Sequence, residues 1–146
     1  MRKEWIPIII MGIIIIIGLY FLMFVKAPSV QAPALGAGLV VTNIKSNDEI
    51  SSPVKITGYV NDSGWSGFEG QVGSVELLDG SGKEIASGTM AATTDWTKLP
   101  ANFEADLNFN AVPDQQGTLV FHNENPSGMP EKDNQFSLPV KIKAKE

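Results

Sequence analysis

The sequence predicts an all-β protein, an immunoglobulin-like β-sandwich of about seven strands that is preceded by one N-terminal transmembrane helix. Two observations carry this prediction. Residues 5–25 contain 18 apolar residues in 21 positions. From residue 39 onward, apolar residues recur at every second position between turn sequences, as in half-buried strands. We therefore assign a cytoplasmic N-terminus to residues 1–4, a transmembrane helix to 5–25, a linker to 26–38 and a folded domain to 39–146.

The segment 5–25 has the length and the composition of a membrane-spanning helix. At about 1.5 Å per residue it reaches about 31 Å, close to the roughly 30 Å of hydrocarbon in a bilayer. A cleaved signal peptide has a shorter apolar stretch of about 7–15 residues, so we expect an uncleaved signal-anchor. Arg2 and Lys3 precede the helix, and the positive-inside rule places that side in the cytoplasm and the C-terminal domain outside the cell membrane.

The segment 26–38 is predicted to be a linker because it is rich in alanine, proline and glycine, a composition typical of connections. The chain after the helix is acidic. Residues 27–146 carry eight lysines and fifteen acidic residues, which gives a net charge of −7. A domain of that charge repels phosphate groups, so no nucleic-acid partner is expected.

Seven runs with a period of two predict the strands of the sandwich. The clearest run is 103–110, in which phenylalanine, alanine and leucine alternate with acidic and amide residues. The others lie at 39–45, 54–60, 74–77, 84–91, 118–122 and 136–143. Pro139 in the last run has no N–H group, so we expect an edge position or a bulge there. Asp-Gly-Ser-Gly at 79–82 is the strongest hairpin signal between the runs.

Three stretches of the domain resemble a known family. They are Ser-Ser-Pro-Val-Lys-Ile-Thr-Gly at 51–58, Phe-Glu-Gly at 68–70 and Val-Glu-Leu-Leu-Asp-Gly-Ser-Gly-Lys-Glu-Ile-Ala-Ser-Gly at 75–88, followed by Asp95-Trp96 ahead of Phe103. In this order and spacing they resemble the immunoglobulin-like domain of bacterial spore-germination proteins, over most of residues 39–143. The resemblance implies a bacterial, extracytoplasmic and non-enzymatic module.

The inventory of reactive residues argues against an enzyme. The chain has one histidine, His122, and no cysteine, whereas nucleophilic catalysis and typical zinc sites need more such groups. Glu104 and Asp106 face one side of a single strand, as glycosidase carboxylates would, but strand alternation alone accounts for them. Acidic loop residues leave structural calcium as an alternative to plain solvated loops. We expect no catalytic residue, no metal site and no cofactor.

Aromatic residues in the loops are the candidates for binding. Trp65, Phe68 and Glu69 lie in one glycine-rich segment, and Trp96 lies in a loop rich in threonine. Aromatic side chains on loops above a rigid scaffold are typical binding anchors, and the alternative is that they fold back over the core. The sequence thus predicts a membrane-anchored binding module whose partner is an envelope protein or a wall polymer. The alternative function is a structural or assembly subunit that associates through its transmembrane helix.

Overall fold

The computed structural model describes residues 34–110 and 113–144. These residues belong to one compact unit of nine strands and a single turn of 3-10 helix, η1. The elements are β1 Ala34–Gly36, β2 Leu39–Val41, β3 Glu49–Ile50, β4 Val54–Val60, β5 Gln71–Asp79, β6 Glu84–Ala92, β7 Ala101–Leu107, β8 Gln115–Asn123, η1 Pro130–Lys132 and β9 Gln135–Ile142. The all-β class predicted for this part of the chain is confirmed.

The predicted membrane helix at 5–25 and the N-terminus at 1–4 lie outside the described residues. Within residues 34–110 and 113–144, no helix has the length and apolar character that a bilayer crossing requires.

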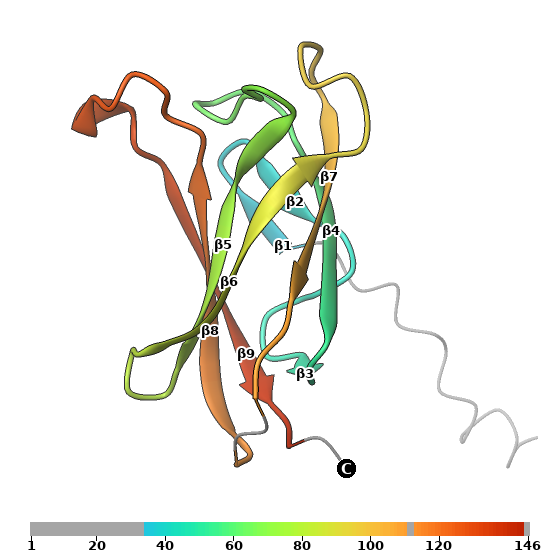
Figure 1. The fold of residues 1–146 in the computed structure, drawn as a ribbon, viewed down its shortest axis with the longest axis vertical. Coiled ribbons are helices and arrows are strands. Elements are labelled where there is room, and N and C mark those ends of the chain that lie inside the picture. The colour runs from blue at the N-terminus through green and yellow to red at the C-terminus, as the bar shows by residue number, and fades with distance from the viewer. Residues whose placement is uncertain (1–33, 111–112, 145–146) are drawn as a thin grey trace, which may run out of the picture. The chain divides into compact units, whose positions relative to one another are not determined.

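The nine strands form one curled sheet with the order β1-β2-β4-β7-β6-β5-β8-β9-β3. Strands β6 and β7 share only two residue pairs, Ala91 with Glu104 and Ala92 with Phe103. At this corner the sheet turns over, so that the layer β1-β2-β4-β7 faces the layer formed by β6, β5, β8, β9 and β3 (Figure 1). The predicted sandwich is therefore built from two halves of a single sheet.

Two strands were not expected from the sequence. Strand β1 occupies part of the segment assigned to the linker, where Leu35 pairs with Val40 of β2. Strand β3 has two residues and pairs in parallel with the end of β9. Elements this short show no period, and only their tertiary partners make them strands. Strand β3 pairs only with Lys141 and Ile142 of β9, so it does not reach Pro139, whose carbonyl accepts a hydrogen bond from the N–H of Asn47 at 2.7 Å.

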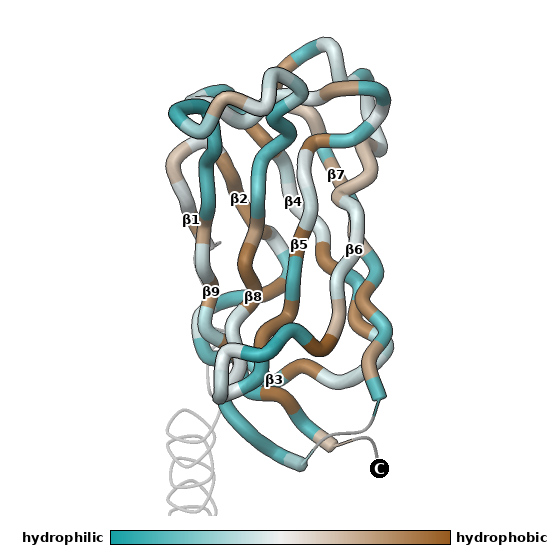
Figure 2. The backbone as a smooth tube through the Cα atoms, turned by 60° about the vertical axis from the view of Figure 1, so that its left-hand side comes forward, coloured by the Kyte–Doolittle hydropathy of each residue, from teal (hydrophilic) through white to brown (hydrophobic). Residues whose placement is uncertain are grey.

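The alternating apolar residues fill the space between the two layers. Strand β7 is the clearest case, since every second residue from Ala101 to Leu107 is buried. Phe121 of β8 packs against Phe136 of β9 with 5.9 Å between the ring centroids. Fully burying one such side chain contributes about 1.5–3 kcal/mol. Figure 2 shows the hydrophobic stretches of β5, β8 and β9 within the body of the domain.

Candidate binding site at the loop end

Three long connections meet at one end of the sandwich. Because β5 is antiparallel to both β6 and β8, and β4 is antiparallel to β7, the β4–β5, β6–β7 and β8–β9 connections all leave the sheet on the same side (Figure 1). We call residues 61–70, 93–100 and 124–134 together the loop end. The segments 43–53 (which include β3), 80–83, 108–110 and 113–114 lie on the other side, and we call them the opposite end.

The first half of the β4–β5 connection turns Trp65 into the core. Asp62, Ser63 and Gly64 all have positive φ angles, of 69°, 57° and 85°. This conformation lets the N–H of Trp65 donate to the carbonyl of Asp62 at 3.1 Å. The Trp65 side chain is only 2% exposed. Trp65 therefore closes the core at this end and is not available as a contact residue.

The second half of the same connection holds Phe68 outward. Glu69 and Gly70 have φ angles of 50° and 85°, the left-handed pair typical of a type I′ hairpin turn. Phe68 and Gln71 exchange backbone hydrogen bonds of 2.8 and 3.0 Å across this turn. The turn fixes the backbone, and the Phe68 side chain remains 41% exposed. Glu69 is also exposed.

The β6–β7 connection packs against the β4–β5 connection. A Cβ atom at Gly67 would lie 2.7 Å from the backbone oxygen of Trp96, so only glycine permits this contact. Asp95 fixes the start of the turn, since its Oδ1 accepts a hydrogen bond from the N–H of Thr97 at 3.1 Å and one from its hydroxyl. That hydroxyl and the ammonium of Lys98 hold the pKa of Asp95 below its ordinary value. Trp96 is thus partly buried on a rigid turn.

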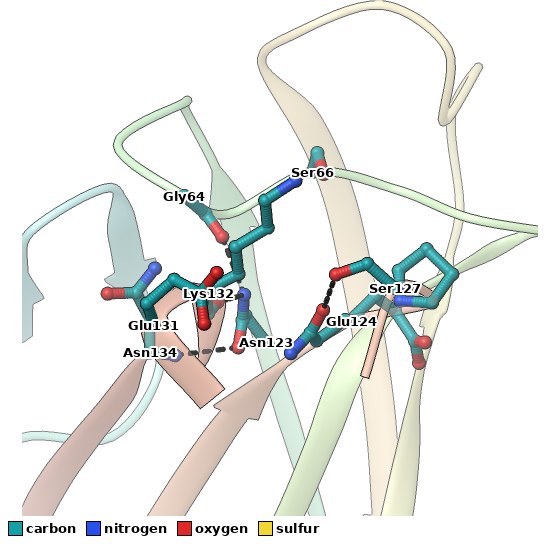
Figure 3. Close-up of a pocket in the computed structure, with 10 residues that line it drawn as sticks. Gly64, Ser66, Asn123, Glu124, Ser127, Glu131, Lys132 and Asn134 are labelled. Atoms are coloured by element: carbon teal, nitrogen blue, oxygen red, sulfur yellow. Dashed lines mark hydrogen bonds between the residues drawn. The ribbon is translucent and has the colours of Figure 1, made fainter. Parts of the chain in front are cut away.

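The β8–β9 connection is held by the amide group of Asn123 (Figure 3). Its Nδ2 donates to the carbonyls of Gly64 at 2.8 Å and Lys132 at 3.0 Å, and its Oδ1 accepts the N–H of Asn134 at 2.8 Å. One side chain therefore ties the β4–β5 and β8–β9 connections together. Asn125 continues the network by donating to the Met129 carbonyl at 2.8 Å.

An open polar pocket of about 410 Å³ lies between these two connections. Glu124, Glu131, Lys132 and Ser66 line it without sharing hydrogen bonds or ion pairs with one another, and in Figure 3 the Lys132 side chain extends toward Ser66. The amides of Asn123 and Asn125 are occupied by the loops. The charged side chains that line the pocket are Glu124, Glu131 and Lys132, which together give it an excess of one negative charge.

Exposed apolar side chains are concentrated at the loop end. Among the described residues four large hydrophobic side chains are exposed, and three of them, Phe68, Leu99 and Met129, lie on the three loop-end connections at 41%, 41% and 46% exposure. The fourth, Leu35, lies on the edge strand β1. Phe68 was predicted from the sequence as a binding residue, whereas Leu99 and Met129 were not, because the prediction rested on aromatic side chains. Apolar residues beside Pro100 and Pro130 were the available signal.

The described residues contain no arrangement suited to catalysis. His122 Nε2 lies 3.7 Å from Glu76 Oε2 and has no hydrogen-bond partner, so no described hydroxyl is aligned with it. Lys55 bridges Glu104 at 3.0 Å and Asp106 at 3.4 Å, which makes these carboxylates part of a surface ion pair. In residues 34–110 and 113–144, no three His, Asp or Glu side chains are grouped as a metal site would need.

The fold and this end together define an immunoglobulin-like β-domain. The family model for the immunoglobulin-like domain of bacterial spore germination matches residues 39–130, and the chain belongs to this family. The resemblance found in the sequence is thereby confirmed. A comparison with curated proteins found no match. Among solved structures the chain is similar to CopC from Methylosinus trichosporium OB3b, with 14% identity and a TM-score of 0.42 over 70% of this chain and 88% of that chain.

Proposed function

We propose that the protein is a membrane-anchored, extracytoplasmic binding module of the bacterial cell envelope, without enzymatic activity, and that it contacts an envelope protein or a wall polymer through the loop end. Among the residues that the structure describes, three of the four exposed large apolar side chains lie on three neighbouring connections, and this observation carries the proposal. Scattered apolar side chains are normal on a protein surface, whereas grouped ones mark interaction sites.

The rigidity of the loop end supports the proposal. Ordering a mobile loop on binding costs free energy, and a loop that is already fixed avoids this cost. The type I′ turn fixes the backbone beside Phe68, Asn123 ties two connections together, and the Gly67–Trp96 contact joins the third. The loop end therefore presents its side chains on a preformed surface.

Site-specific photocrosslinking in the intact envelope tests the proposal. A photoreactive amino acid is placed in the full chain at Phe68 or Met129, and at Leu35 as the matched control, since Leu35 is the exposed apolar residue outside the loop end. We expect a discrete crosslinked species from the two loop-end positions and none from Leu35. Equal crosslinking from all three positions, or none, would contradict a loop-end binding site.

The alternative, an assembly subunit that associates through its helix, gives a different result. Replacing residues 5–25 by an unrelated apolar helix of equal length would then abolish the crosslinks, whereas a loop-end partner would be retained. Protease treatment of spheroplasts tests the orientation separately, because an extracytoplasmic domain is digested without lysis.

A further inference from the structure

The loop end carries most of the domain's unbalanced charge. It contains six acidic residues and two lysines, a net charge of −4, whereas the opposite end has three acidic residues and two lysines, a net charge of −1. Among the loop-end carboxylates, only Asp95 forms an ion pair within the described residues. Glu69, Glu124 and Glu131 form no ion pair and no side-chain hydrogen bond there.

Apolar and acidic groups therefore occur together on one rigid surface. Phe68 neighbours Glu69 in the same turn, and Met129 is followed two residues later by Glu131. The polar pocket with Glu124 and Glu131 lies between the connections that carry Phe68 and Met129. A partner whose charge is opposite to that of the surface is steered toward it, whereas a partner of like charge is repelled.

Resting on the proposed function, we infer that the partner of the loop end is a cationic protein segment in which lysine or arginine residues alternate with apolar side chains. Its apolar residues contact Phe68, Leu99 and Met129. A cationic side chain enters the polar pocket, where Glu124 and Glu131 outnumber the one cation, Lys132. Anionic lipids and anionic wall polymers are disfavoured as partners because a surface of charge −4 repels them.

Selection from a random peptide library displayed on phage tests the chemistry of the partner without assuming its sequence. The bait is the full chain in neutral detergent. We expect selected peptides that are enriched in lysine or arginine together with apolar residues. Their affinity should fall with added salt, since exposed charge pairs are screened over about 10 Å at 0.1 M salt.

Five variants, two of them controls, locate the binding surface. Phe68→Ser and Met129→Ser should each weaken binding of a selected peptide about tenfold, as for removal of an interface anchor, and Leu35→Ser should leave it unchanged. Glu131→Lys should weaken binding about fivefold, an effect of the size measured for exposed charge pairs. Its matched control is Glu84→Lys, the same change on an exposed residue that starts β6 at the opposite side.

The outcomes separate this inference from the proposed function. Neutral or acidic selected peptides that still depend on Phe68 and Met129 would overturn the cationic partner and leave the loop-end site intact. Selected peptides that bind all variants equally, or a library that yields none, would overturn the cationic partner as well. The crosslinking experiment then decides on the loop-end site by itself. Circular dichroism of each variant confirms that the fold is kept.

Discussion

The two ends of the sandwich differ in how their polar and charged side chains are paired, although the same strands lead into both. At the opposite end the polar groups satisfy one another. Asp79 Oδ1 accepts hydrogen bonds from the N–H of Ser81 at 2.8 Å, the hydroxyl of Ser81 at 2.6 Å and the N–H of Lys83 at 3.0 Å. Lys143, just after β9, pairs with Asp114 at 2.6 Å.

At the loop end the hydrogen bonds hold the backbone, and three of the described carboxylates are left without a partner. Asn123 and the Glu69-Gly70 turn fix the connections, while the carboxylates of Glu69, Glu124 and Glu131 have no ion-pair partner among the described residues. A surface whose charges are neutralised internally has little to offer a partner. The difference is the basis for the proposal that a partner binds at the loop end.

The largest expected loss of stability comes from replacing the buried tryptophan of the loop end, and it is compared with the loss at the partly buried one. Trp65→Ala should lower the free energy of unfolding by about 3–5 kcal/mol, because it removes a large side chain that is 2% exposed. Trp96→Ala, which removes a partly buried side chain, should cost about 1 kcal/mol. Urea denaturation followed by circular dichroism measures both. Similar losses for the two tryptophans would show that the loop end is packed throughout.

The next largest loss of stability is expected from an alanine substitution at one of two glycines that lie at different ends of the molecule. Gly38 and Gly82 have nearly equal φ angles, +80° and +83°. A Cβ at Gly82 meets nothing within 4 Å, but at Gly38 it would lie 1.9 Å from the backbone oxygen of Asp62. Gly82→Ala should cost about 1 kcal/mol from backbone strain alone. Gly38→Ala should cost about 2–4 kcal/mol because overpacking adds to that strain.

Urea denaturation separates the two contributions in this glycine pair. Equal losses of unfolding free energy would mean that the turn at 37–38 moves away from Asp62 and that the loop end is less rigid than its contacts suggest.

Asn123→Asp tests the amide that ties two connections together. The substitution keeps the shape of the side chain and replaces the Nδ2 donor by an acceptor facing the carbonyls of Gly64 and Lys132. We expect a loss of about 1–3 kcal/mol, as for a hydrogen-bonded group left without its partner. Asn108→Asp is the control, an equal change of charge at an exposed residue of the opposite end.

Hydrogen exchange measures where Asn123→Asp acts. Faster exchange should be confined to residues 61–64 and 124–134. Uniformly faster exchange over the whole sheet would contradict a role of Asn123 that is limited to holding these two connections together.

The smallest effect concerns the ion pair at the opposite end. The ammonium of Lys143 holds the pKa of Asp114 below its ordinary value. A folded-state pKa below the unfolded one means that the pair contributes stability above the ordinary aspartate pKa and loses it as the pH falls through the lowered value. Lys143→Met should move the pKa of Asp114 up toward its ordinary value.

Carboxyl NMR titration measures the pKa of Asp114, with Asp95 as the internal control. The pKa of Asp95 is lowered first by Thr97 at the loop end and should not change in the Lys143→Met variant. A shift of both carboxyls would show that Lys143 acts through the overall charge of the domain and not through its local pair.

Much of the fold could be predicted from the sequence because strand alternation is a local property. The hairpin at 79–82 appears where the pattern placed it, and the run predicted at 103–110 overlaps β7, which begins at Ala101 and ends at Leu107. The pattern missed β1 and β3, since segments of three and two residues carry no period. The described part of the chain therefore has nine strands, and not about seven.

The candidate site was predicted less well because exposure depends on backbone direction. Trp65 and Phe68 lie three residues apart in one glycine-rich segment, so composition alone does not predict which of the two side chains is exposed. The left-handed residues Asp62, Ser63 and Gly64 turn one side chain into the core, and the Glu69-Gly70 turn leaves the other exposed. Leu99 and Met129 join Phe68 only because antiparallel pairing brings three distant connections to one end.

The sequence by itself determined the all-β class, the core positions and the acidic balance of the chain, because alternation and composition do not depend on distant contacts. The tertiary structure alone decided which loop residues face outward and which of their charges stay unpaired. Those properties depend on residues far apart in the chain, such as Asn123 and Gly64, that meet only when the sheet has folded over.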